Sequence, residues 1–169
     1  LALVRFPLIE ETTASVRPVE NDVLVAALPA TSALARLRKL SLRDLAGEPF
    51  VVYSADAALK LRVQVVGACQ AVGFTPLIAQ EAVQVQTVLS LVGSGVGVAL
   101  VPSLSQMQAP SGVVFRKLLD KDNRLETALA VVTHPQNEPS AAIKFREVLA
   151  SLGPAEHSLL PKRRTNARC

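Results

Sequence analysis

The sequence predicts an α/β fold in which short apolar strands alternate with amphipathic helices. Residues 22–28 and 98–101 are nearly continuous apolar runs of strand length, as expected for strands buried on both faces. Residues 57–72 and 84–92 instead repeat apolar side chains every three or four positions, which is the helical spacing. The glycines of residues 93–97 allow a tight turn from the second helix into the next strand. Such alternation predicts largely parallel sheets.

The first third of the chain is expected to supply three strands and one short helix. The strands are predicted at Leu1–Arg5, Asp22–Leu28 and Pro49–Tyr53. Ser41 is a suitable N-cap for a helix over Leu42–Ala46, since its hydroxyl can accept a hydrogen bond from the first turn.

The middle of the chain is expected to hold two helices and two strands. A helix over Ala57–Val72, ended by Gly73, would present Leu59, Val63, Val66 and Cys69 on one face. A strand at Leu77–Ala82 then leads to a helix over Gln84–Val92 and a strand at Val98–Val101. The second helix would bury Val85, Val88, Leu89 and Val92.

The last third is expected to add two strands and a helix. The strands are predicted at Gly112–Leu118 and Leu125–Thr133, separated by a polar turn. The helix Pro139–Leu152 has proline in its first turn and Gly153 past its end, the usual asymmetry of helix termini.

Composition indicates a compact domain in a reducing, cytoplasmic setting. The chain has 169 residues, of which 50% are hydrophobic, enough for one sizeable core or two small lobes. No apolar run approaches the roughly 18 residues of a membrane span. Two cysteines, Cys69 and Cys169, provide no disulfide framework.

Positive charge is concentrated in two places. Lys162, Arg163, Arg164 and Arg168 belong to a basic tail over residues 154–169, which we expect to be disordered. A second cluster consists of Arg36, Arg38, Lys39 and Arg43. It contains no aromatic residues that could stack on bases, so we expect no DNA contact from this chain alone.

The residues that usually carry chemistry are scattered. His134 and His157 have no partner at metal-ligand spacing, and no serine stands in a nucleophile elbow. We therefore expect no catalytic residue, no metal site and no cofactor.

Five segments together resemble a known family. Residues 84–103 resemble the LVxxGxGxxLVPxS signature of LysR-type transcriptional regulators, within their effector-binding domain. Four further segments match in the same order, at residues 22–29 with 34–35, 42–50, 69–76 and 80–82. The match covers about 100 residues closely and extends more loosely from Leu1 to Gly153.

The resemblance implies a periplasmic-binding-protein-like (type 2) fold, in which two α/β lobes are joined by two crossover strands around a ligand cleft. Residues 30–124 would form a complete second lobe, whereas residues 1–29 and 125–153 would form the crossovers and a partial first lobe. Family members begin with a winged helix-turn-helix, so this chain looks like a fragment without it. Residues 32–35 read Ser-Ala-Leu-Ala where the family usually has His-Pro-Leu-Ala, so the chain departs from the family pattern at the first hinge.

The resemblance also implies a small organic effector, such as a carboxylate or aromatic acid, bound in the cleft. Helix N-termini and an arginine fork suit a negative charge. The matching positions are Leu3 and Arg5 on the first lobe, and Ser54, Lys60, Leu61, Gln84, Val85 and Thr87 on the second. The alternatives are structural: Ser54 caps a helix, Thr87 bonds within its own helix, Leu61 and Val85 are core residues, and Arg5 and Lys60 are solvated.

The implied function is that of an effector-sensing domain in a bacterial transcriptional regulator. In the family, such domains form dimers and tetramers, and DNA is bound only through the winged helix-turn-helix; no membrane partner is expected. A periplasmic-type solute-binding protein of the same fold and a small α/β enzyme are the alternatives.

Overall fold

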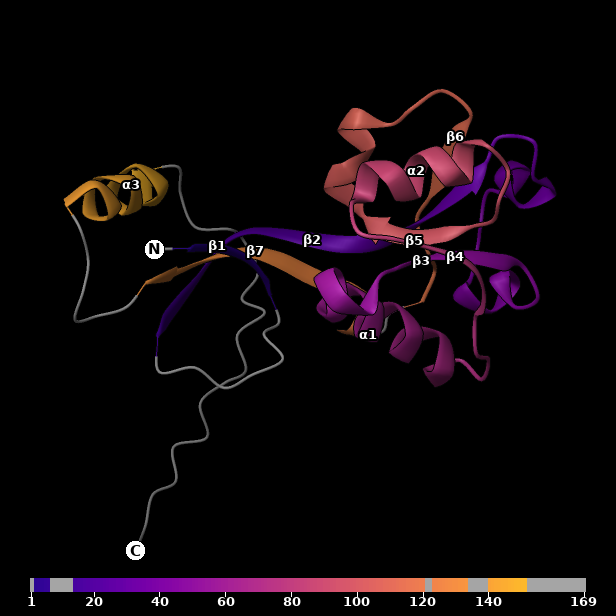
Figure 1. Ribbon diagram of the computed structural model, residues 1–169, viewed down its shortest axis with the longest axis horizontal. Helices are drawn as coiled ribbons and strands as arrows, with labels where there is room; N and C mark the ends of the chain where they lie inside the picture. The colour runs from indigo at the N-terminus through magenta and orange to yellow at the C-terminus, as the bar shows by residue number, and fades with distance from the viewer. Residues whose placement is uncertain (1, 7–13, 121–122, 134–139, 152–169) are drawn as a thin grey trace, which may run out of the picture. The chain divides into compact units, whose positions relative to one another are not determined.

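The computed structural model describes residues 2–6, 14–120, 123–133 and 140–151, and the chain divides into two compact units (Figure 1). Unit 1 comprises Leu1–Asn21 and Ala128–Cys169, and unit 2 comprises Asp22–Thr127. The sequence assigned residues 22–29 to the first lobe as part of a crossover. In the structure these residues group with unit 2, because they pair there with two other strands.

Unit 2 contains two groups of paired strands. The long strand β2 (Ser15–Pro29) pairs antiparallel with β5 (Ala99–Pro102) and with β6 (Val113–Arg116). Strand β3 (Pro49–Tyr53) pairs in parallel with β4 (Leu77–Ala82). The expectation of largely parallel sheets is therefore wrong for the described strands. The expectation was based on strand–helix alternation along the chain. Although α2 directly precedes β5, both β5 and β6 run antiparallel to β2, so alternation alone did not fix strand direction.

The helices of unit 2 occur close to the predicted positions. Helix α1 spans Ala55–Ala71 and α2 spans Val85–Gly93. The predicted helix at Leu42–Ala46 is a 3₁₀ helix, η2 (Leu42–Leu45), whose N-terminus is closed by Ser41 and Asp44 in a capping box. Three further 3₁₀ helices were not predicted, η1 (Ala33–Arg36), η3 (Ser103–Gln108) and η4 (Asn123–Leu125), since such short elements leave no clear periodicity.

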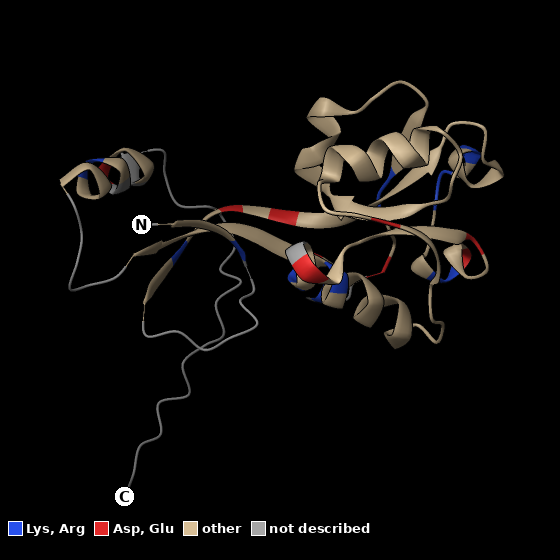
Figure 2. Ribbon diagram, viewed as in Figure 1, with Lys and Arg blue, Asp and Glu red and all other residues tan. Residues whose placement is uncertain are grey.

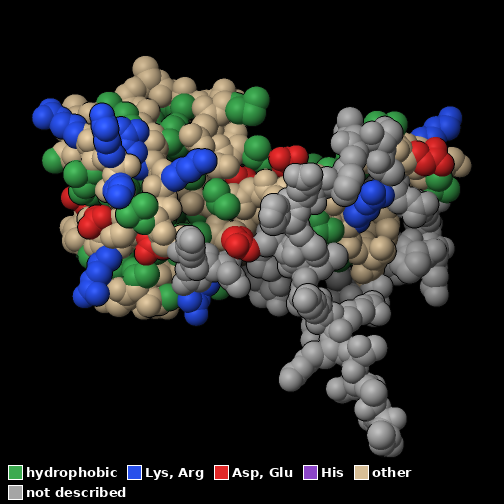
Figure 3. Space-filling view, turned by 180° about the vertical axis from the view of Figure 1, so that it is seen from behind, with side chains coloured by type: hydrophobic (Ala, Val, Ile, Leu, Met, Phe, Trp, Pro, Cys, Tyr) green, Lys and Arg blue, Asp and Glu red, His purple; other side chains and the backbone are tan. Residues whose placement is uncertain are grey.

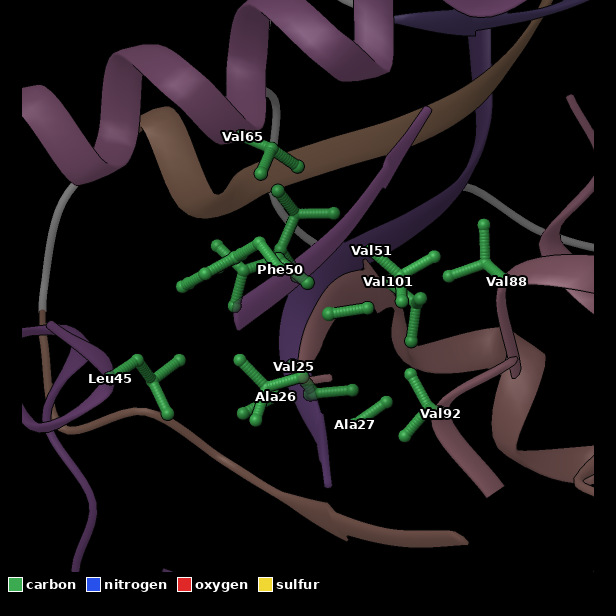
Figure 4. Packing of buried hydrophobic residues seen from close by; sticks show 14 of the residues in the cluster. Val25, Ala26, Ala27, Leu45, Phe50, Val51, Val65, Val88, Val92 and Val101 are labelled. Carbon is green, nitrogen blue, oxygen red and sulfur yellow. The ribbon is translucent and has the colours of Figure 1, made fainter. Parts of the chain in front are cut away.

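The core of unit 2 lies between these strands and helices, as Figure 4 shows. Phe50, Val51, Val52 and Tyr53 of β3 are all buried. They pack in one cluster with the buried face of α2, made of Val88, Leu89 and Val92, and with Val25, Ala26 and Ala27 of β2. The predicted burial is thus confirmed for residues 24–28 and 98–101 and for Val88, Leu89 and Val92, whereas Val23 is exposed and Val85 is half-buried.

Helix α1 faces the core differently from the prediction. Val65, Ala68 and Cys69 are buried, whereas Leu59 and Val63 are 49% and 54% exposed. The predicted stripe is therefore wrong for Leu59 and Val63, while the burial of Cys69 is confirmed. Apolar residues recur on most sides of this helix, so that helical spacing alone fits more than one face. The non-helical Ala58, with φ −135° and ψ 38°, also interrupts the register at the start.

Cys69 is expected to resist thiol reagents in the folded chain. Its side chain is completely buried, and desolvation of the thiolate raises the pKa of the thiol to about 12. In a Cys169→Ser background, native labelling by a disulfide reagent at mild alkaline pH should be slower than labelling in urea by about a thousandfold, because the thiolate is the reacting species. Rapid stoichiometric labelling of the native chain would contradict this burial.

Unit 1 is built around an antiparallel pair. Strand β1 (Ala2–Phe6) pairs with β7 (Glu126–Thr133), with Ala2 opposite Val132 and Phe6 opposite Ala128. Strand β7 in turn neighbours β2. Helix α3 spans Ser140–Ser151, and the predicted tail, both histidines and Cys169 lie outside the described residues. None of the described helices has the length and apolar character needed to cross a bilayer.

Candidate functional site

The candidate site in unit 2 lies where α1 and α2 begin, beside the ends of two parallel strands. Tyr53 pairs with Ala82 at the carboxyl ends of β3 and β4. The backbone N–H of Ser54 then donates to the carbonyl of Ala82, at 3.0 Å. Because parallel strands end at the same edge, the two helix N-termini that follow them lie at that edge too.

The start of α1 has an irregular shape. The N–H of Ala58 donates to the carbonyl of Ser54 at 3.1 Å, closing one turn before the backbone leaves helical geometry at Ala58. The regular helix therefore starts after Ala58, which places Lys60 and Leu61 in its first turn. First-turn N–H groups lack partners within their own helix and are available to a ligand.

Two hydroxyl groups at this edge are uncommitted. Ser54 is the N-cap of α1 but makes no side-chain capping bond, and Thr87 in the first turn of α2 is exposed without a hydrogen-bond partner among the described residues. Farther along, Ser90 and Ser94 each donate to a carbonyl one turn earlier, at 2.9 Å. Ser54 and Thr87 thus do not make the local bonds that a purely structural role would give them.

The other predicted site residues of unit 2 differ in exposure. Gln84 is the N-cap of α2, where its carbonyl accepts from the N–H of Val88 at 3.0 Å and its side chain is exposed. Lys60 is exposed as well. Leu61 and Val85 are half-buried and pack against the core cluster. This packing agrees with the alternative that both are core residues.

An ion pair that sequence reasoning missed supports this edge. The Nη1 atom of Arg62 lies 2.6 Å from Oε1 of Glu81 and donates to the carbonyl of Tyr53 at 3.0 Å. It thereby joins α1 to the ends of both parallel strands. In the ribbon of Figure 2, acidic and basic positions lie next to one another at the start of α1, where Asp56 occupies the first turn. The only signal in the sequence was that Glu81 falls in a family-like segment.

Leu3 and Arg5 lie in unit 1, on β1. Leu3 is opposite Val131 and is 57% exposed, while Arg5 is opposite Leu129 and half-buried. The six candidate site residues of unit 2 therefore lie around the starts of α1 and α2. Leu3 and Arg5 lie together on one strand of unit 1. No group of three metal-ligating side chains occurs in the described part of the chain.

Comparison with known proteins gives a family and a set of relatives. The model of the LysR substrate binding domain matches residues 1–153. The chain is 30% identical over 112 residues to the HTH-type transcriptional regulator AlsR of Bacillus subtilis, covering 66% of this chain and 37% of that protein. It is 35% identical over 140 residues to the HTH-type transcriptional regulator XapR of Escherichia coli, covering 80% and 44%. The chain thus spans less than half the length of these curated relatives, which are regulators rather than enzymes.

Solved structures show the same fold. The BenM effector-binding domain with its effector benzoate has a TM-score of 0.73 at 22% identity, covering 89% of this chain and 67% of that one. The effector-binding domain of QuiR in complex with shikimate has a TM-score of 0.72 at 16% identity, covering 89% and 71%. These likenesses confirm the predicted periplasmic-binding-protein-like (type 2) fold.

Proposed function

The chain belongs to the family of LysR substrate-binding domains, and from this premise we propose that it senses a small organic acid for a bacterial transcriptional regulator. The observation that carries the proposal is the pair of helix starts beside the ends of β3 and β4. Backbone N–H groups and helix dipoles favour a negative charge there. The free hydroxyls of Ser54 and Thr87 add two donors.

The chemistry of the related complexes supports a carboxylate. Benzoate and shikimate, which are bound by the effector-binding domains of BenM and QuiR, each carry one carboxylate on a six-membered ring. In this chain, the carboxylate would accept from first-turn N–H groups and from the two hydroxyls. The remaining proposed contacts are Lys60, Leu61, Gln84 and Val85 on unit 2 and Leu3 and Arg5 on unit 1.

The effector would act by shifting an equilibrium rather than through catalysis. It must bind two conformations with different affinity, since equal affinity would leave their populations unchanged.

We propose that the complete regulator is a cytoplasmic homo-oligomer that contacts its promoter through a winged helix-turn-helix. The exposed Leu59 and Val63 on α1 and Leu77 and Ile78 on β4 support self-association, because they offer apolar surface beside an edge strand.

Loss of one hydroxyl should weaken the binding of an acid. We expect Thr87→Val, which keeps the side-chain shape, to raise the Kd of the acid that binds by about tenfold, the effect of one hydrogen bond to a charged group. Ser54→Ala should act similarly. Thermal shift and calorimetry with aromatic and hydroaromatic carboxylates, including benzoate and shikimate, provide the measurement.

Two controls make this test specific. Ser90→Ala removes a hydroxyl of α2 that is bonded within the helix, so it should leave acid binding unchanged. The methyl esters of the same acids should produce no shift, because they carry no negative charge. Equal shifts by acids and esters, or equal effects of Ser90→Ala and Thr87→Val, would reject the proposed carboxylate site.

A further inference from the structure

Unit 2 has a strongly basic end, formed by η1, η2 and the residues at the end of β6. Six of the nine Lys and Arg residues described in this unit lie there, against three acidic residues, Asp44, Glu48 and Asp120. The six are Arg36, Arg38, Lys39, Arg43, Arg116 and Lys117. The rest of the unit has three basic and four acidic residues. Charge is therefore segregated toward one end, and Figure 3 shows several Lys and Arg side chains close together on unit 2.

The backbone of this basic end is held in place by contacts between distant segments. The guanidinium of Arg116 donates to the carbonyls of Ala35 and Leu37. Leu40 forms a parallel bridge with Leu118, and its carbonyl accepts from the N–H of Leu119 at 2.9 Å. Residues 35–40 and 116–119 thus run side by side. Lys117 consequently lies near the cations of the first segment, although they are 78 or more positions apart in the sequence.

Five of the six cations are unpaired and exposed. Arg36, Arg38, Lys39, Arg43 and Lys117 make no ion pair or hydrogen bond through their side chains within the described chain. Two of the three neighbouring carboxylates, those of Asp44 and Asp120, are held by hydrogen bonds rather than by ion pairs. Asp44 accepts from the N–H and hydroxyl of Ser41, and Asp120 accepts from the N–H of Leu42 at 2.6 Å. Six cations against three carboxylates leave this end a net charge of +3, and five of the cations are exposed to solvent.

We propose that this basic end binds the sugar–phosphate backbone of duplex DNA. Residues 30–48 and 116–120 contain no aromatic residue, so the surface lacks the stacking groups of single-strand binders and the aromatic anchors common in protein interfaces. The lack of aromatic residues was the reason to expect no DNA contact from the sequence. Binding to the backbone of a duplex, however, needs only cations that face phosphates. The contact is independent of sequence and adds to whatever reads the bases. It does not depend on an acid binding at α1 and α2.

Salt-dependent binding to an arbitrary duplex tests the proposal. In the protein used for this test, glutamine replaces the four cations of the tail, Lys162, Arg163, Arg164 and Arg168. The charge of the tail then cannot contribute to DNA binding. Fluorescence anisotropy with a labelled duplex of about 30 base pairs should then give an association constant that falls with salt, with a slope of log K against log salt near −4.5 if about five phosphates are neutralised. Arg36→Gln/Lys39→Gln should weaken binding about tenfold and reduce the slope by about 2.

A matched pair provides the control. Arg17→Gln/Lys144→Gln removes the same charge from exposed positions of β2 and α3 and should leave both Kd and slope unchanged. Failure of the tail-neutralised chain to bind duplex at low salt would overturn the proposal, as would equal weakening by the two pairs. Competition by polyglutamate as effective as that of duplex would also overturn it, because it would indicate an acidic protein partner.

Discussion

Replacement of Gly97 by alanine is expected to destabilise the chain by about 3 kcal/mol, at the upper end of the usual cost of overpacking a core. A Cβ at this position would lie 2.3 Å from the carbonyl oxygen of Pro49 and 2.8 Å from its carbonyl carbon. Both atoms belong to the backbone, so the rotation of a side chain cannot relieve the clash. The same backbone is held by two 2.8 Å hydrogen bonds, from the N–H of Val98 to Pro49 and from the N–H of Val51 to Val98.

Gly67 in α1 is the control for this prediction. A Cβ there would meet nothing within 4 Å, and the position is inside a helix. Gly67→Ala should therefore stabilise the chain by about 1 kcal/mol, since alanine is the better helix former and restricts the unfolded chain. Urea unfolding followed by circular dichroism measures both variants. A Gly97→Ala chain as stable as Gly67→Ala would show that β3 and the start of β5 do not approach so closely.

Removal of the Asp22 carboxylate is expected to cost about 3 kcal/mol, because it leaves buried donors without their charged acceptor. Asp22 is only 5% exposed at the point where unit 2 begins. Its Oδ1 atom accepts from the hydroxyl of Ser103 at 2.6 Å, from the N–H of Val23 at 2.8 Å and from the N–H of Leu104 at 3.3 Å. The carboxylate therefore connects β2 to the first turn of η3. Urea unfolding of Asp22→Ala gives the measurement.

A double-mutant cycle separates the bond between Asp22 and Ser103 from the other contacts of Asp22. Ser103→Ala alone should cost about 1 kcal/mol, and its effect should become much smaller in an Asp22→Ala background. Asp22→Asn retains an acceptor oxygen and should cost less than Asp22→Ala. Additive effects of the two alanine substitutions would show that the hydroxyl and the carboxylate do not interact.

Much of the candidate site could be predicted from the sequence, because its position follows from local signals. Strand β3 is continuously apolar, and α2 repeats apolar residues at helical spacing. Both elements also lie in or beside segments that match the family. These patterns were sufficient to place Ser54, Gln84 and Thr87 at helix starts. Their contacts with a ligand stay a prediction.

The ion pair of Arg62 with Glu81 could not be predicted in the same way. The two residues stand on different elements, and each is ordinary in its own segment. Their meeting depends on the angle and register at which α1 packs on β3 and β4. The kink at Ala58 contributes to that register, and no residue type in the sequence marks it.

The sequence by itself determined most of the segments that become strands and α-helices, where Gly73 ends a helix in a positive-φ conformation, and to which family the chain is related. These properties depend on residues close together in the chain or on motifs that can be read directly. Only the tertiary structure decided that β5 and β6 run antiparallel to β2, that α1 turns Val65 and Cys69 inward, and that Lys117 joins the cations of η1 and η2. Strand direction, helix rotation and charge clustering arise from contacts between distant segments, so they depend on the packing of the whole unit and are not encoded in any single window of sequence.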